Sequence, residues 1–490
     1  MTASREPRDS ATPSGECRVG PLLYLRGAAN GQVSLVALVG VGAETETPVL
    51  ETNAGAVEAQ VLLKRDGVRI LQYAFDLEVT ASAWYELDGE RFEVDVALDG
   101  DLRVAFVSCN GEEDEREIAN QVERNALWTR LAGQHRERPF QLMIQGGDQI
   151  YADGLAEAHS RVAQWRDDEH GRKAKRETAE GIDEVREALC GAFLRHYLDA
   201  LSQPDIAWLM ARVPSVAMWD DHDICDGWGS LPEAKLDSPV GRCLFDVARE
   251  YFLLFQLGSG PKQDLPDYCL DRSGQSLGWH LPLPGLHLLG PDLRSERRPK
   301  RVMGERGWDG FQRALDAIDS GRVLLLSTVP ALGPRLSWLE FAMKLTHRME
   351  KYEDDLRDQW QSRSHRKEWR RFLEALARVH RNPSTPVTVV SGEIHLATRG
   401  TFDVPPAPLH QLVASGIAHP APPLAYARTL GALAKVGETP VPGHPIRLHP
   451  LPGQLPVYTA QRNYLILERH GETWRTWWEL EEGATPAIEL

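Results

Sequence analysis

Residues 141–154 read QLMIQGGDQIYADG, a short apolar run that stops at two glycines and an acid. The run at residues 141–144 is too short for a helix, and a continuous apolar run is typical of a strand covered on both faces. Glycines let the backbone approach a bound group closely, and the carboxylate of Asp148 offers two oxygens that can bridge two cations. The stretch therefore predicts a strand that ends in a polar site, with a plain polar turn as the alternative.

Similar short apolar runs follow along the chain and alternate with helical patterns. They lie at residues 104–108, 215–219, 286–289, 323–327, 387–391 and 409–414. Helical spacing of apolar residues runs through residues 182–197 and 369–379. Strands that alternate with helices predict an α/β fold with buried sheets.

The first hundred residues have a different, β-rich pattern with turn residues between short strands. We expect a flexible tail at residues 1–19 and a β-sandwich-like domain at residues 20–100. The remaining residues, 101–490, form the predicted α/β domain. Within it we expect helical insertions at about residues 155–212 and 335–382 and a closing hairpin at residues 463–480.

Composition excludes several classes of partner. The 490 residues contain 55 Lys and Arg against 71 Asp and Glu, a net charge of −16, so a nucleic-acid surface is not expected. No apolar run reaches the length of a membrane span, and the N-terminus lacks the apolar core of a secretory signal. With scattered cysteines, this favours a cytoplasmic protein without membrane insertion. The oligomeric state stays open.

Side chains that can bind metals or carry chemistry gather directly after three further apolar runs. Residues 108–110 read SCN, residues 219–229 read WDDHDICDGWG, and residues 391–396 read SGEIHL. In open α/β sheets, sites form beyond the carboxyl ends of the strands. The four clusters, including GGDQIYADG, are therefore expected to meet.

The second of these clusters is dense in charge. It holds His222 and four carboxylates within seven residues, and these repel one another unless a cation or bound water compensates. A hydrated surface loop is the alternative, but the flanking tryptophans Trp219 and Trp228 favour burial. The carboxylates are Asp220, Asp221, Asp223 and Asp226.

The other clusters supply donors of different types. Cys109 is a possible thiolate ligand, or part of a packed strand end. Glu393 and His395 are two residues apart, so on an extended segment they face the same way and suit two neighbouring metals. Mixed carboxylate and imidazole donors indicate two hard or borderline cations, which can clamp a phosphoryl group and activate water.

The ordered set of SCN, GGDQIYADG, WDDHDICDGWGS and SGEIHLATRG resembles the PhoD-like (alkaline phosphatase D) group of the metallophosphoesterase superfamily. The segments PDLRS at residues 291–295 and ASGIAHP at residues 414–420 strengthen the resemblance, which spans roughly residues 20–481. It implies a four-layer α/β/β/α sandwich with an N-terminal all-β domain. Residues 101–490 would then be the catalytic domain.

The resemblance also implies a ligand set and a reaction. Asp148 would bridge two metals. The resemblance implies Fe³⁺ as the first metal and Ca²⁺ or another divalent ion as the second. The first metal would be held by Cys109, Tyr151 and His395, and the second by Asp221 and Glu393. A metal-bound hydroxide would attack a small phosphoester, monoester or diester, while His222 protonates the leaving group.

Two further residues have open roles. Arg294 is the best cationic candidate for holding a phosphate oxygen, because guanidinium pairs well with it, and a surface arginine is the alternative. Trp228 is expected either to wall the substrate pocket or to pack in the core.

The chain departs from the family pattern at two points. Glu393 stands where the family usually has Asp, and no twin-arginine export signal is present. The first departure keeps open a non-catalytic or weakly active metal-binding homologue. A hydrolase with Cys109 as nucleophile and His222 as base is a further alternative, although no GxSxG element occurs.

Overall fold

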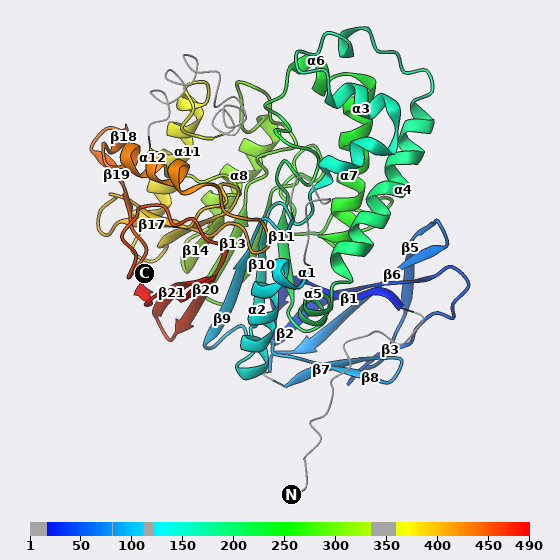
Figure 1. Ribbon diagram of the computed structural model, residues 1–490. Coiled ribbons are helices and arrows are strands. Elements are labelled where there is room, and N and C mark those ends of the chain that lie inside the picture. The colour runs from blue at the N-terminus through cyan, green and yellow to red at the C-terminus, as the bar shows by residue number, and fades with distance from the viewer. Residues whose placement is uncertain (1–16, 81, 112–120, 335–358) are drawn as a thin grey trace, which may run out of the picture.

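Two large β-sheets pack against each other at the centre of the molecule (Figure 1). The computed structural model describes residues 17–80, 82–111, 121–334 and 359–490. The predicted tail at residues 1–19 lies almost wholly outside these ranges. Residues 335–358 of the second predicted helical insertion also lie outside them.

The first sheet contains the strands that precede three of the four polar clusters. Strands β9, β10 and β11 run parallel, with Ile144 opposite Phe106 and Val216, so their carboxyl ends share one edge. The predicted closing hairpin is confirmed as β20 and β21. Across the sheet the order is β22 (Gly483–Ala484), β21 (Thr473–Leu480), β20 (Asn463–His470), β9 (Leu102–Val107), β10 (Leu142–Gly146), β11 (Ser215–Met218), β1 (Cys17–Ala29), β2 (Gln32–Gly42), β6 (Val68–Glu78) and β5 (Ala59–Arg65), with β23 (Ile488–Glu489) beside β21.

The second sheet holds the fourth polar cluster at the end of β15. Its strands β13, β14, β15 and β17 are parallel, so their carboxyl ends also share an edge. The order is β12 (Trp279–Leu283), β13 (Leu286–Gly290), β14 (Arg322–Leu326), β15 (Val387–Ser391), β17 (Leu409–Val413), β16 (Thr398–Phe402), β19 (His444–His449) and β18 (Glu438–Val441).

Side chains of the second sheet alternate between two cores. Leu288 and Leu324 join the core shared with the first sheet, whereas their neighbours Leu289 and Leu325 join a core formed with helices α8 (Glu305–Ala317) and α11 (Arg366–His380). On the other side, α2 (Ala126–Glu137) contributes Leu131 to the core of the first sheet, and α5 (Pro204–Met210) contacts β1. The predicted four-layer α/β/β/α sandwich is therefore confirmed.

The β-rich N-terminal residues take part in two sheets. Strands β1, β2, β5 and β6 extend the first sheet, because β1 pairs in parallel with β11. A small sheet lies beside them, with β4 (Gly55–Val57), β3 (Leu50–Thr52), β7 (Ala83–Leu87) and β8 (Glu90–Val94) in that order. The predicted domain boundary near residue 100 stays a prediction.

A group of helices, here called the helical lobe, stands at the upper right of Figure 1. It comprises η2 (Ala152–Ala158), α3 (Ser160–Arg166), η3 (Ala174–Arg176), α4 (Ile182–Leu201), α6 (Glu233–Leu236) and α7 (Pro239–Phe255). The helical patterns predicted at residues 182–197 and 369–379 fall within α4 and α11 and are confirmed. The remaining helices are α1 (Gln121–Arg124) and α12 (Leu424–Ala434).

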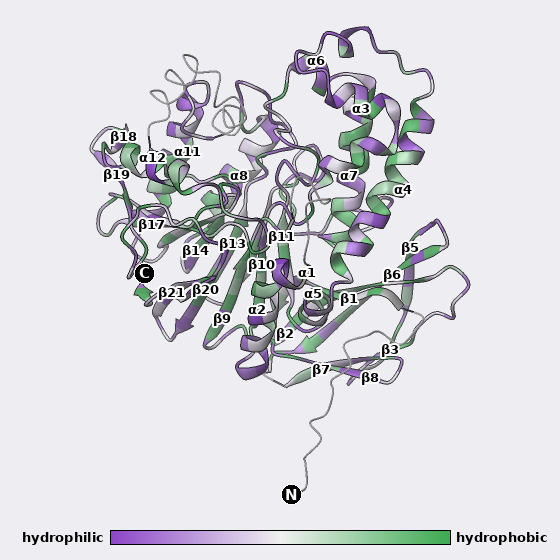
Figure 2. Ribbon diagram, viewed as in Figure 1, coloured by the Kyte–Doolittle hydropathy of each residue, from purple (hydrophilic) through white to green (hydrophobic). Residues whose placement is uncertain are grey.

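Hydrophobic residues line the central strands, and polar residues gather in the outer loops (Figure 2). This distribution is the one expected when both sheets are covered on both faces. Within the described ranges, no helix combines the length and the apolar character needed to cross a membrane.

Candidate metal centre

Loops from both sheets meet at one edge of the sandwich. The backbone N–H of Ile417, which follows β17, donates to the carbonyl of Ser108 after β9 at 3.0 Å. The N–H of His419 donates to the carbonyl of Cys109 at 3.1 Å. The two sheets approach so closely here that a Cβ added at Gly392 would stand 2.5 Å from the Ser108 hydroxyl.

Four predicted ligands share an uncommon backbone conformation. Their φ angles are positive, in the left-handed region that residues with a side chain rarely adopt. Such conformations cost about 1–3 kcal/mol each and persist where the surrounding structure holds them, often at functional sites. The residues are Cys109 (φ 54°), Asp148 (φ 54°), Glu393 (φ 66°) and His395 (φ 52°).

The first group of donors combines a thiol, a carboxylate, a phenol and an imidazole. The Cys109 Sγ lies 3.5 Å from Asp148 Oδ2 and 3.2 Å from the Ser415 hydroxyl, which accepts from the His395 backbone N–H at 2.7 Å. The rings of Tyr151 and His395 lie 6.5 Å apart. The structure thus brings together the four residues predicted for one metal.

These donors are buried without partners for several of their polar atoms. Asp148 Oδ1, Tyr151 Oη and His395 Nδ1 are buried and make no hydrogen bond within the described residues. Burial raises the pKa of the Cys109 thiol and of the Tyr151 phenol, and it raises the pKa of Asp148 well above the ordinary carboxyl value. Because buried polar atoms normally have partners, this donor set fits a bound cation.

A second group consists of three buried carboxylates. One oxygen each from Asp148, Asp220 and Asp221 lie within 4.8 Å of one another. Asp221 Oδ2 accepts from the Gly227 N–H at 2.9 Å, which fixes the orientation of that carboxylate. Three carboxylates at this separation repel strongly, so a cation between them would be stabilising.

Arg294 supplies part of the opposing charge. Its side chain is fully buried, with an exposed fraction of 0%, so the alternative of a surface arginine is wrong. The Arg294 Nε donates to Asp220 Oδ1, and its Nη2 lies 3.1 Å from Asp221 Oδ1. The guanidinium is thus committed to carboxylates of the site, and direct contact with a substrate phosphate is not favoured by this geometry.

Glu393 has a partner that the sequence did not indicate. The Nε2 of Gln359 lies 2.7 Å from both carboxylate oxygens of Glu393. The side chain is half-buried, at the end of β15 and on the side of the site formed by the second sheet. The loop after β15 therefore brings Glu393 to the same edge as the other donors. Its carboxylate accepts hydrogen bonds from the side-chain amide of Gln359.

His222 forms a tight pair with an acid to which the sequence assigned no role. Its Nδ1 donates to Asp153 Oδ2 at 2.7 Å, and Asp153 Oδ1 accepts from the Asp226 N–H at 2.7 Å. Burial acts to lower the pKa of His222, but the carboxylates of Asp153 and Asp221 outweigh it and hold the pKa well above the ordinary value. The pair with Asp153 therefore orients the imidazole, and the neighbouring carboxylates favour its protonated form.

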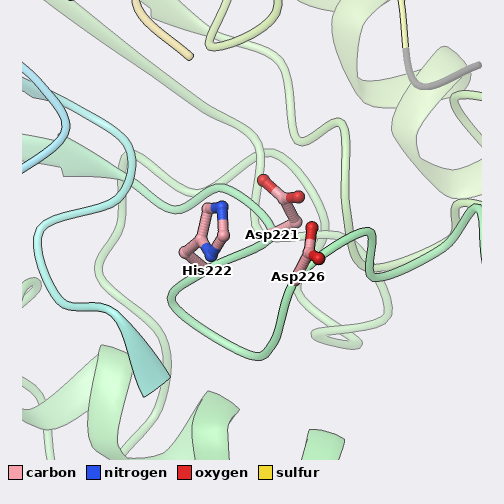
Figure 3. Close-up of side chains that lie close together, drawn as sticks. All are labelled: Asp221, His222 and Asp226. Atoms are coloured by element: carbon pink, nitrogen blue, oxygen red, sulfur yellow. The ribbon is translucent and has the colours of Figure 1, made fainter. Parts of the chain in front are cut away.

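The carboxylates of the DDHDICD segment have separate roles. Figure 3 shows Asp221, His222 and Asp226 on one loop, and their ligand atoms lie within 4.8 Å of one another. Asp223 instead accepts from the N–H groups of Asp148 and Asp220, both at 2.9 Å. Burial raises the pKa of Asp223 to about 7. Its hydrogen bonds connect the loop after β10 to the loop after β11.

Burial of this segment was correctly expected from its flanking tryptophans. Asp220, Asp221, His222 and Asp223 are all buried, while Asp226 is exposed. Of the two roles considered for Trp228, the structure favours core packing, because its ring stacks on Phe245 at 5.4 Å.

His419 also belongs to the site, and the sequence analysis gave it no role. Its ring stacks on His395 at 3.6 Å between centroids and on Tyr151 at 5.4 Å. Its Nδ1 lies 2.7 Å from the Pro420 carbonyl. The segment ASGIAHP could have indicated this role for His419, because it follows β17 in the same way as the other clusters follow their strands.

The geometry does not favour Cys109 as a nucleophile. Burial raises the pKa of its thiol, and the side-chain partners given by the structure are the hydroxyls of Ser108 and Ser415 and the carboxylate of Asp148. A nucleophilic cysteine instead needs a thiol pKa below the ordinary value, or an adjacent base that removes its proton.

Comparison with known proteins gives one sequence family and one clear structural likeness. A model of the family described as PhoD-related phosphatase matches residues 80–352, more than half of the chain. An uncharacterised protein of Saccharomyces cerevisiae is 25% identical over an alignment of 435 positions, which covers 74% of this chain. The chain spans 61% of the length of that relative.

A solved structure of PhoD superposes with a TM-score of 0.57 at 12% identity, covering 98% of this chain and 90% of that chain. The likeness shows a shared fold. A dimetal phosphatase from Danio rerio reaches a TM-score of 0.33 at 11% identity, over 79% of this chain and 98% of that chain, which is too low to inform the fold.

Proposed function

The chain belongs to the family of PhoD-related phosphatases, and we propose that it hydrolyses small phosphoesters at a centre of two metal ions. The observation that carries this proposal is the set of buried donor atoms without hydrogen-bond partners at one sandwich edge, namely Asp148 Oδ1, Tyr151 Oη and His395 Nδ1. Both phosphomonoesters and phosphodiesters are candidate substrates.

The donor types suggest two different cations. Cys109, Asp148, Tyr151 and His395 would hold a borderline cation, for which the family resemblance implies Fe³⁺. Oxygen donors from Asp148, Asp221 and Glu393 would hold a harder cation, for which it implies Ca²⁺ or another divalent ion. Asp148 is common to both sets because its two oxygens can serve two ions.

The metals supply polarisation of the phosphoryl oxygens and a water of lowered pKa when they are bound. The protein residues supply the proton for the leaving group and keep the site in shape. His222, protonated and held by Asp153 at 2.7 Å, donates a proton to the leaving oxygen. Arg294 offsets the negative charge of Asp220 and Asp221, so that the loop carrying His222 keeps its shape.

The proposal is tested by Asp148→Asn in the full chain. We expect loss of metal content and at least about a 100-fold fall in phosphoester hydrolysis, because the amide removes the bridging charge. Metal per chain is measured by elemental analysis and turnover by phosphate or alcohol release. A visible absorption band from a tyrosinate–Fe³⁺ pair would disappear as well.

The matched control is Asp264→Asn, which changes an exposed loop carboxylate to the same amide. It should retain wild-type metal content and turnover. Wild-type metal content and turnover in Asp148→Asn would contradict the proposal.

The contact of Glu393 with Gln359 favours one second candidate, a homologue that binds metals but turns over slowly or not at all. Two metals per chain without turnover across a panel of monoesters and diesters would support it. Glu393→Asp, which has the acid usual in the family, should then raise turnover.

A further inference from the structure

A cavity of about 660 Å³ lies in the helical lobe beside the metal centre. Its walls come from η2, α3, α4, α6, α7 and the loop after β11. Cavities that bind small molecules have volumes of about 300–1,000 Å³, so this one is large enough for a ligand group.

The cavity shares three wall residues with the site. Tyr151 stacks its ring on His222 at 4.4 Å, and Asp153 is the acid paired with His222. The Asp226 carboxylate lies within 4.8 Å of the ligand atoms of Asp221 and His222 (Figure 3). The cavity therefore borders the site beside the Asp153–His222 pair and the Tyr151 ring.

The lining of the cavity is mainly apolar. Trp165 is buried, and its indole N–H donates to the Lys235 carbonyl at 3.1 Å, so the ring presents carbon atoms to the space. The larger apolar lining residues are Leu155, Val162, Trp165, Ile224, Leu231 and Leu244.

The charged lining residues disfavour an anionic ligand. The Lys235 ammonium donates to the Arg166 carbonyl at 3.0 Å and lies 4.6 Å from the centre of the Trp165 ring. The Arg166 guanidinium pairs with Glu157 at 3.0 Å. Since both cations are already engaged by other protein groups, the wall offers them poorly to a second phosphate or a carboxylate on the ligand.

We propose that this cavity receives the leaving group of the substrate and that this group is an uncharged apolar alcohol, alkyl or aryl. The inference rests on the proposed hydrolase function and specifies its substrate class. Water forms the new bond to phosphorus, and the P–O bond to the alcohol breaks with its electron pair going to the alcohol oxygen. His222 gives that oxygen a proton, the attacking water releases a proton to solvent, and His222 is reprotonated from solvent.

The first test uses the wild-type, metal-loaded full chain. Ethyl, butyl, hexyl and octyl phosphates and their methyl diesters are compared, with release of the alcohol measured. We expect kcat/KM to rise about fourfold per added methylene until the cavity is filled, from the transfer of each CH₂ out of water. Glycerol phosphate and substrates with a carboxylate on the leaving group should be poor.

The second test fills or polarises the cavity. Ala156→Phe and Leu231→Asn should each reduce the rise in kcat/KM per added methylene to less than about twofold. The matched controls are Ala425→Phe and Val61→Asn, both at exposed positions outside the cavity, and these should keep the wild-type gain. Two variants are used so that a folding defect in one leaves the test intact.

The outcomes separate the two proposals. Hydrolysis that does not depend on chain length, or that keeps its dependence in both cavity variants, overturns the leaving-group inference and leaves the hydrolase function standing. No hydrolysis of any ester by fully metal-loaded protein overturns the hydrolase function and this inference with it.

Discussion

Asp153 is the residue on which the orientation of His222 depends. One carboxylate oxygen accepts from His222 Nδ1, and the other accepts from the Asp226 N–H, so the acid ties the imidazole to its own loop. A histidine whose Nδ1 is held in this way presents its Nε2 to the reacting group. Asp153 is thus a positioning residue, five residues after the predicted bridging acid Asp148.

Asp153→Asn should lower the pKa of His222, because it removes the carboxylate that contributes most to raising it. A general acid works only while protonated, so the pH above which kcat declines should move downward. We expect kcat to fall about 10–100-fold for alkyl phosphates and less for nitrophenyl phosphate, whose leaving oxygen hardly needs a proton. The measurement is a kcat–pH profile with both substrates.

The control for this change is Asp167→Asn, an exposed acid in the same lobe, which should leave the profile unchanged. An unaltered pH profile in Asp153→Asn, with equal losses for both substrates, would instead show a purely structural role.

Helix α2 carries a buried histidine near its last turn. His135 Nδ1 accepts from the Phe140 N–H at 3.1 Å, which closes the turn leading into β10. Burial and three nearby arginines lower the pKa of His135 from 6.5 to about 4. The folded protein therefore favours the neutral ring, whereas the unfolded chain takes up a proton near pH 6.5.

The stability contributed by neutral His135 is present above pH 6.5 and is lost as the pH falls toward 4. His135→Asn should reduce the difference in unfolding free energy between pH 7 and pH 5 by about 1–2 kcal/mol, because Asn can accept the same hydrogen bond without titrating. Urea unfolding at both pH values measures this. The exposed His170→Asn is the control, and an unchanged difference in His135→Asn would refute the assignment.

At the scale of the whole molecule, the site exists only because the two sheets touch. Gly392 directly follows β15 of the second sheet, and a Cβ there would stand 2.7 Å from the Ser108 Cβ and 3.0 Å from the Gly146 carbonyl of the first sheet. A side chain at this position would separate loops that carry predicted ligands from both sheets.

Gly392→Ala should cost about 1–3 kcal/mol of unfolding free energy and reduce the metal content, because the overpacked contact cannot relax without moving a ligand loop. Denaturant unfolding and elemental analysis measure the two effects. Gly133→Ala is the matched control, since its added Cβ meets no atom within 4 Å on helix α2. It should keep its metals and gain up to about 1 kcal/mol. Full metal content and stability in Gly392→Ala would contradict this account of the interface.

Local patterns were enough to predict the strands and the donor residues. The apolar run before Asp148 became β10, and the runs before Cys109, Asp220 and Glu393 became β9, β11 and β15. Such patterns are readable because burial of a strand depends on neighbouring residues and because glycine and acids mark where it ends. The order of the clusters also sufficed to identify the family.

The partners of each charged side chain were decided by packing between distant segments. Arg294 pairs with Asp220 across 74 residues, and Asp153 pairs with His222 across 69. Nothing within the DDHDICD segment distinguishes Asp221, a candidate metal ligand, from Asp223, whose carboxylate accepts hydrogen bonds from two loops. Sequence therefore determines which donors stand at the strand ends, whereas tertiary structure decides which of them face a cation, because desolvation and pairing arise only when the two sheets close on one another.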